Sequence, residues 1–121
     1  MEERIVFPFL TAQGDLYGAN GRAISSDEKV RYRSIKNDDI MTEKCFGLEQ
    51  YDPYVQGYNF EGPIDSLYLP NSIALAGAGT FKRGHTVFNP DNTTLVFDNE
   101  PRNPYICNFM ERSLENGFQV F

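Results

Sequence analysis

Short apolar runs separated by turn residues limit the fold of this chain more than any other feature of its sequence. Residues 3–11, 72–76 and 93–97 are rich in aliphatic, aromatic and β-branched side chains, and a Gly, Asn or Asp follows each run closely. Runs of this length and composition are typical of β-strands. Both faces of residues 3–11 are apolar, which predicts a strand covered on both sides. Pro8, which has no N–H to donate, indicates that this strand lies at a sheet edge or a bulge.

Further elements are predicted in the middle of the chain. Residues 29–35 alternate apolar and basic side chains, as does a strand with one face in water. The dipeptide Asn20-Gly21 favours a two-residue hairpin turn. We also expect a short helix within residues 38–48 and a short strand over residues 66–69.

The end of the chain carries the pattern of an amphipathic helix. Asn103 is suited to cap the helix and Pro104 to occupy its first turn, while Gly117 supplies the stop. Between them, apolar side chains recur at helical spacing on one face: Ile106, Phe109, Met110 and Leu114. The sequence therefore predicts one C-terminal amphipathic helix.

Length and composition predict a single folded domain over residues 1–121. The chain is 40% hydrophobic, with 10 Phe and 7 Tyr, which is enough to bury one core and too apolar for a disordered protein. Predicted strands outnumber predicted helices. We expect a mainly β fold, a small barrel or sandwich of about seven or eight short strands with one C-terminal amphipathic helix.

The stretch GTFKRGHT, residues 79–86, differs at one position from the phosphate-binding loop pattern G-x-x-x-x-G-K-[ST], with His85 in place of the lysine. A working phosphate loop needs a helix N-terminus after its glycines and a lysine that reaches the outer phosphates. Here the residues after Gly84 are β-branched and aromatic and meet Pro90 soon afterwards, which favours extended backbone. We interpret the stretch as a glycine turn between two strands.

The same region resembles a known family of small barrels. Gly77, Gly79 and Phe81 are similar to the Gly-x-Gly-x-Phe hairpin of the allene oxide cyclase and dirigent family, in which this segment joins two adjacent strands. The resemblance implies a barrel whose interior takes an apolar small molecule or carries out a cyclase-like or isomerase-like reaction.

The charge of the chain argues against nucleic acid and membrane surfaces as partners. Seventeen acidic and eleven basic residues give a formal net charge of -6, so the mean field repels phosphate backbones and anionic lipids. A local group of basic residues could form a positive strip on this acidic body, although we interpret it as the solvated face of a strand: Lys29, Arg31, Arg33 and Lys36.

Targeting and redox signals are few. No apolar run approaches the roughly 18 residues that span a bilayer, and the N-terminus lacks the pattern of a signal peptide, which favours the cytoplasm. Cys45 and Cys107 fit either one disulfide or two reduced thiols, and Asn92 begins a glycosylation sequon that matters only in an exported protein.

Candidate site residues are few as well. The single histidine, His85, excludes multi-histidine zinc sites and is expected as an exposed contact residue in the glycine turn. Carboxylates are plentiful, but no spacing selects a catalytic pair among Asp38, Asp39, Glu43, Asp65, Asp91 and Glu100. We therefore expect no catalytic residue, no metal and no cofactor. An aromatic cluster is the expected contact surface for a ligand or partner: Tyr51, Tyr54, Tyr58 and Phe60.

Three functions are consistent with these features. The first is a non-enzymatic β-rich structural module that acts through protein–protein contacts or homo-oligomerisation, because residues 118–121 would form a short apolar strand able to pair with another chain. The second is a small barrel that binds an apolar small molecule or acts as a cyclase or isomerase. The third is an acidic mimic of nucleic acid. We favour the first.

Overall fold

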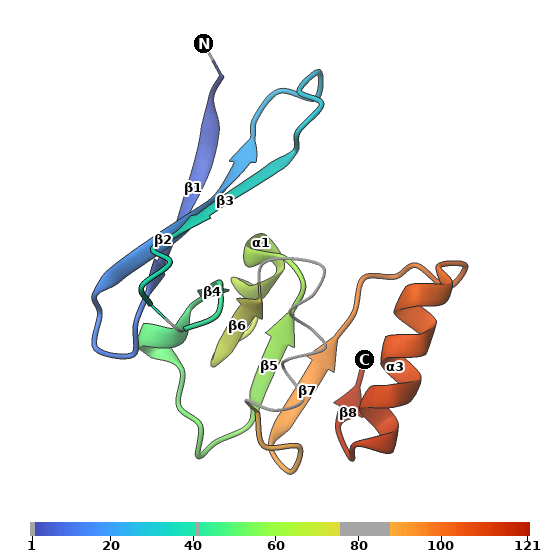
Figure 1. Ribbon diagram of the computed structural model, residues 1–121. Helices are drawn as coiled ribbons and strands as arrows, with labels where there is room; N and C mark the ends of the chain where they lie inside the picture. Colours follow the sequence, from blue (N-terminus) through green and yellow to red (C-terminus); the bar gives the residue numbers. More distant parts are fainter. Residues whose placement is uncertain (1, 41, 76–87) are drawn as a thin grey trace.

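The computed structural model describes residues 2–40, 42–75 and 88–121, which form two β-sheets and one main helix (Figure 1). The strands are β1 (Arg4–Leu10), β2 (Leu16–Ala23), β3 (Tyr32–Lys36), β4 (Cys45–Phe46), β5 (Gly57–Phe60), β6 (Ser72–Leu75), β7 (Thr93–Val96) and β8 (Gln119–Val120). The helical segments are η1 (Leu48–Gln50), α1 (Pro63–Ser66) and α3 (Pro104–Glu115). The described fold is mainly β with one main helix, as predicted.

The first sheet is a three-stranded antiparallel sheet in the order β1-β2-β3. The strand β1 lies at its edge, as Pro8 predicted. Phe7 and Phe9 are buried, whereas Val6 is 62% exposed. The prediction that both faces of this strand are covered was therefore wrong, because only the face that carries the two phenylalanines meets the rest of the chain.

Contacts between β1, β2 and β4 attach the first sheet to the second. The ring of Phe7 meets Phe46 edge-on, with 5.4 Å between the ring centroids. The hydroxyl of Tyr17 donates to the backbone oxygen of Glu43 over 2.6 Å and accepts from the Cys45 N–H over 3.2 Å. Because Tyr17 is buried, these hydrogen bonds fix the position of one sheet against the other.

The second sheet has five strands in the order β4-β6-β5-β7-β8. The central strand β5 pairs in parallel with both β6 and β7, and β8 pairs in parallel with β7. Ile73 on β6 and Leu95 on β7 are fully buried. Strands of this kind are covered on both faces, which explains their nearly continuous apolar sequences.

The helix α3 covers part of this sheet and confirms the helix predicted from the sequence. Asn103 is its N-cap, and the side-chain oxygen accepts a hydrogen bond from the Tyr105 N–H over 3.1 Å. Gly117, with φ 84°, follows its end. Ile106, Phe109 and Met110 pack against the core, whereas Leu114 is 59% exposed. None of the described helices combines the length and the apolar character that a bilayer-crossing segment requires.

Three local predictions were wrong, two of them because pairing with distant strands decided the structure. Asn20 and Gly21 lie inside β2, hydrogen-bonded between β1 and β3, and form no hairpin turn. Residues 38–48 contain β4 and the start of η1 instead of a helix with apolar spacing. Residues 66–69 comprise the last residue of α1, Ser66, and the turn that follows it. In the first two cases a local preference of a few tenths of a kcal/mol was outweighed by tertiary contacts.

The strand topology differs from the architecture that we expected. Both described sheets are open, with their strands in linear order, so the structure does not show a barrel or a sandwich. The C-terminal strand β8 pairs with β7 of the same chain, with Thr94 opposite Gln119. Both cysteines are free, and burial raises the pKa of the Cys45 thiol to about 12, which keeps it protonated and unreactive.

We predict that Gly18→Ala destabilises the fold. A Cβ at Gly18 would lie 2.4 Å from the backbone oxygen of Ile35, so β2 and β3 would have to separate. We expect a loss of about 1–3 kcal/mol, measured by urea denaturation. Gly21→Ala is the matched control on the same strand, because its Cβ would approach the flexible Arg4 side chain at 3.2 Å and the Arg33 backbone oxygen at an ordinary contact distance of 3.8 Å. Equal losses in the two variants would contradict this account.

We also predict that Asn59→Leu stabilises the protein. Asn59 lies in β5 with 0% exposure, and neither its side-chain oxygen nor its side-chain nitrogen has a hydrogen-bond partner in the described part of the chain. A buried amide without partners costs about 1–3 kcal/mol, and leucine has the same branched shape without the polar atoms. Thermal unfolding followed by circular dichroism should give a higher Tm. A lower Tm would indicate instead that a buried water satisfies the amide.

Candidate active site

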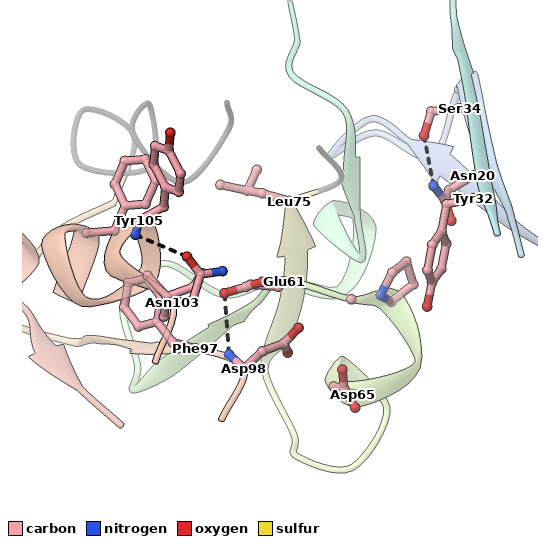
Figure 2. A pocket seen from close by; sticks show the side chains of 14 residues that line it. Asn20, Tyr32, Ser34, Glu61, Asp65, Leu75, Phe97, Asp98, Asn103 and Tyr105 are labelled. Atoms are coloured by element: carbon pink, nitrogen blue, oxygen red, sulfur yellow. Dashed lines mark hydrogen bonds between the residues drawn. The ribbon is translucent and has the colours of Figure 1, made fainter. Parts of the chain in front are cut away.

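Two carboxylates meet where the parallel strands β5 and β7 end. Phe60 is paired with Val96 at the ends of these strands, so Glu61 and Asp98 follow at the same edge of the sheet. The Asp98 N–H donates to Glu61 Oε1 over 3.3 Å, a contact drawn in Figure 2. In open sheets with parallel strands, ligands bind at the carboxyl ends of the strands. The pair therefore lies where a ligand site is expected.

Two further carboxylates surround this pair. Gly62 and Pro63 start α1 directly after Glu61, which places Asp65 in the first turn of that helix. A short turn after Asp98 brings Glu100 back, since the Glu100 N–H donates to the Asp98 backbone oxygen over 2.8 Å. Glu100 Oε2 also accepts from Asn103 Nδ2 over 2.7 Å. The cap residue of α3 therefore holds one acid of the group in place.

The acids raise one another's pKa values. Burial, followed by the negative charge of Asp98, raises the pKa of Glu61 to about 7. Burial, followed by the charge of Asp65, raises the pKa of Asp98 above its ordinary value. Carboxylates so close together cannot all ionise without cost, so near neutral pH the group either retains a proton or binds a cation. Strongly raised carboxyl pKa values in a cleft are typical of functional sites.

Glu61, Asp65 and Asp98 form one wall of a cleft of about 760 Å³ between the two sheets and α3. In Figure 2, Glu61 and Asp98 lie between Tyr105 and Asn103 on one side and Asn20, Tyr32 and Ser34 on the other. The remaining lining is largely apolar: Leu75, Phe97, Ile106 and Phe109. A cleft of this size with apolar walls and a few converging polar groups accommodates a small organic ligand.

The donor atoms of the site suit a hard divalent cation. Among the described residues no group of three or more His, Cys, Asp or Glu side chains forms a ready metal cage. Magnesium does not require one, because it is commonly held by one or two carboxylates together with waters and the phosphates of a substrate. Glu61 and Asp98, whose carboxylates supply only oxygen, fit that mode of binding.

The fold does not gather the four aromatic residues predicted as a contact surface into one surface. Tyr51 packs over Gly57, where an added Cβ would lie 2.6 Å from its ring, and against Phe88. Tyr58 and Phe60 alternate with Gly57 along β5 and so point to the opposite face of the sheet. Tyr54 is 90% exposed in a loop. None of the four lines the cleft.

The other predicted contact residue, His85, lies outside the described residues. The same is true of the stretch 79–86 interpreted as a glycine turn, and of Gly77, Gly79 and Phe81, which carried the resemblance to the allene oxide cyclase family. These predictions therefore remain untested.

Sequence reasoning missed Glu61 and Asp98, although a signal was present. Each acid stands at the end of a short apolar or aromatic run, Tyr-Asn-Phe before Glu61 and Thr-Leu-Val-Phe before Asp98. An acid directly after a strand that is buried on both faces indicates the ligand-binding edge of a parallel sheet. Asp65 and Glu100 belong to the large set of carboxylates whose spacing in the sequence does not single out a catalytic pair.

The fold contains a sheet with parallel strands and an acidic cleft at the carboxyl ends of those strands. Comparison with known proteins identifies proteins that are similar to this chain. The chain is 35% identical over 122 residues to the DNA primase of Enterobacteria phage T4, a match that covers 98% of this chain and 34% of the phage protein. The chain thus spans about a third of that relative's length. No protein-family model matches the chain.

Solved structures of primases share the fold. The Aquifex aeolicus primase, solved with its zinc-binding and RNA polymerase domains, matches with a TM-score of 0.66 and 22% identity, over 98% of this chain and 33% of that one. The DnaG primase catalytic domain bound to single-stranded DNA also matches with a TM-score of 0.66 and 18% identity, over 98% of this chain and 43% of that one. The described chain therefore has the fold of a primase catalytic region.

These relatives overturn two expectations from the sequence. The favoured function, a non-enzymatic structural or protein-binding module, was wrong, and so was its alternative, a small barrel for an apolar ligand, because the proteins that match nearly the whole chain are DNA primases. The expectation of no nucleic-acid partner was also wrong, since a matching catalytic domain was solved with single-stranded DNA bound. The prediction from net charge failed because net charge is an average over the whole surface and does not describe the local charge around one cleft.

We predict that the stability of the metal-free protein falls as pH rises from about 4.5 toward about 7. The folded protein binds more protons than the unfolded chain in this window, because the folded pKa of Glu61 is raised, so each increase in pH favours unfolding. Glu61→Gln should flatten this part of the profile in thermal unfolding with EDTA present. Asp91→Asn, at an exposed loop acid, is the control and should leave the profile unchanged. An unaltered slope in Glu61→Gln would contradict the assignment.

Proposed function

We propose that this chain forms the catalytic region of a primase, which joins ribonucleotides on a single-stranded DNA template. The observation that carries the proposal is the Glu61–Asp98 carboxylate pair at the carboxyl ends of β5 and β7, inside a cleft. The match to a DNA primase across 98% of the chain supports the same reaction class. This proposal replaces our expectation that the chain has no catalytic residue and no metal.

The reaction is a nucleotidyl transfer. The 3′-hydroxyl of one nucleotide attacks the α-phosphorus of a nucleoside triphosphate, a new P–O bond forms, pyrophosphate leaves, and the hydroxyl proton passes to water. A divalent cation, when bound, would neutralise the phosphate charge and stabilise the transition state. Glu61 and Asp98 would hold it, both in the ionised form. Asp65 and Glu100 add negative potential that favours a bound cation and opposes a bare phosphate.

Positive side chains around the first sheet support contact with a nucleic-acid backbone. Lys29, Arg31 and Arg33 are exposed in β3 and in the segment before it. Arg22 lies over the ring of Tyr32, with 5.7 Å from the guanidinium carbon to the ring centroid. The segment between β2 and β3 projects away from the second sheet (Figure 1). A strip of this kind is what backbone binding requires.

We also propose that residues 1–121 act as one domain. The cleft takes its walls from both sheets, with Asn20 and Tyr32 on the first and Glu61 next to the second. The hydrogen bonds of Tyr17 to Glu43 and Cys45 hold these walls at a fixed separation.

We predict that Glu61→Gln and Asp98→Asn each reduce primer synthesis by about 100-fold or more, because each removes a charge that holds the cation. The measurement is incorporation of labelled ribonucleotides on single-stranded DNA with Mg²⁺ present, using the full-length protein. Asp91→Asn is the matched control and should retain activity, since Asp91 is an exposed acid outside the cleft lining. Full activity in both site variants, or no synthesis by the unaltered protein, would refute the proposal.

A further inference from the structure

The side-chain oxygen of Asn20, a residue of the cleft lining, has no hydrogen-bond partner among the described residues. Asn20 is 4% exposed, and its Nδ2 donates to Ser34 Oγ over 2.8 Å. Its Oδ1 is buried and accepts no hydrogen bond from the residues that the structure describes. Buried polar atoms in native proteins are nearly always paired, and an unpaired one costs free energy. Asn20 is among the residues that line the cleft, so a donor group on a ligand bound there would complete this buried acceptor.

The position and orientation of this amide are fixed by the first sheet. In the strand register, Asn20 stands between Phe7 on β1 and Ser34 on β3, and Phe7 is itself buried. The hydrogen bond to Ser34 occupies the amide nitrogen and leaves the oxygen as the free end. Figure 2 shows the Asn20–Ser34 pair on the wall across from Glu61 and Asp98.

We propose that Asn20 Oδ1 accepts a hydrogen bond from the nucleoside part of a bound nucleotide, either from a sugar O–H or from a base N–H. The inference rests on the proposed function and adds a specificity-determining residue to it. A phosphate cannot fill this role, because its oxygens are ionised acceptors and would repel a carbonyl oxygen. The donor must come from the sugar or the base, since only those parts of a nucleotide carry O–H or N–H groups.

The rest of the cleft suits this arrangement. The acids stand where phosphates and their cation would lie, and the Asn20 wall also carries the half-exposed ring of Tyr32. The apolar lining gives a base or sugar a surface to pack on: Leu75, Phe97, Ile106 and Phe109. The cleft volume of about 760 Å³ lies within the range of sites for small ligands.

The experiment measures dissociation constants of ribonucleoside triphosphates with Mg²⁺, by calorimetry on the full-length protein. Asn20→Leu removes the acceptor while keeping the branched shape, and we expect it to raise Kd about five- to tenfold, as the loss of one hydrogen bond does. Asn59→Leu, at a buried asparagine outside the cleft lining, is the control and should leave Kd unchanged. Equal Kd values for Asn20→Leu and the unaltered protein would overturn the inference and would indicate that a water satisfies the oxygen.

Substrate analogues identify the donor and do not depend on the folding of a variant. The series is 2′-deoxy and 3′-deoxy nucleotides for the sugar, and inosine and purine riboside triphosphates for the base amino groups. One analogue should bind the unaltered protein more weakly than its parent nucleotide does. In Asn20→Leu, the same analogue and its parent should have equal dissociation constants. If every analogue binds the unaltered protein as its parent does, the inference is wrong, even where primer synthesis on single-stranded DNA upholds the proposed function.

Discussion

The parallel pairing of β5 with β7 is the constraint on which the rest of the structure depends. It places Phe60 opposite Val96, and it brings Glu61 and Asp98, which are 37 residues apart in the chain, within hydrogen-bond contact. Parallel strands need a crossover between them, so the acids can meet only after α1, β6 and the segment that follows have returned the chain to the same edge. The site is therefore a product of topology, because neither strand alone carries both acids.

The cleft holds groups that lower the stability of the empty protein. Glu61 is partly buried and Asp98 is exposed, both lie beside other carboxylates, and their raised pKa values express the free energy that their ionisation costs. The unpaired oxygen of Asn20 adds a second unfavourable group on the opposite wall. Hydrophobic contacts elsewhere, such as the buried Ile73 and Leu95 on the strands beside β5, offset these costs. Functional sites commonly combine such local destabilisation with a well-packed scaffold.

Local signals in the sequence predicted some elements well and others poorly. The helix α3 could be predicted because its cap Asn103, its first-turn proline and its apolar spacing lie within one short segment. The strands β1, β6 and β7 were predicted from composition for the same reason. Asn20-Gly21 was assigned to a turn because the dipeptide prefers one in isolation, and only pairing to β1 and β3 on both sides reversed that preference. The open sheets could not be predicted, because strand order depends on contacts between distant segments.

By itself, the sequence determined that this chain is mainly β, with one amphipathic helix near its C-terminus, since helical and strand periodicities are properties of neighbouring residues. The sequence also contained every acid of the site, but no feature of it separated these acids from the others. Asp65 and Glu100 had no stronger sequence signal than Asp91 had. Only the tertiary structure selected Glu61 and Asp98, by placing two strand ends side by side, and only it showed that Asn20 lies in the opposite wall with a free oxygen. The physical reason is that a site requires residues from distant parts of the chain to lie close together. Hydrophobic burial, which forms the sheets, decides which residues meet, and the preferences of neighbouring residues do not.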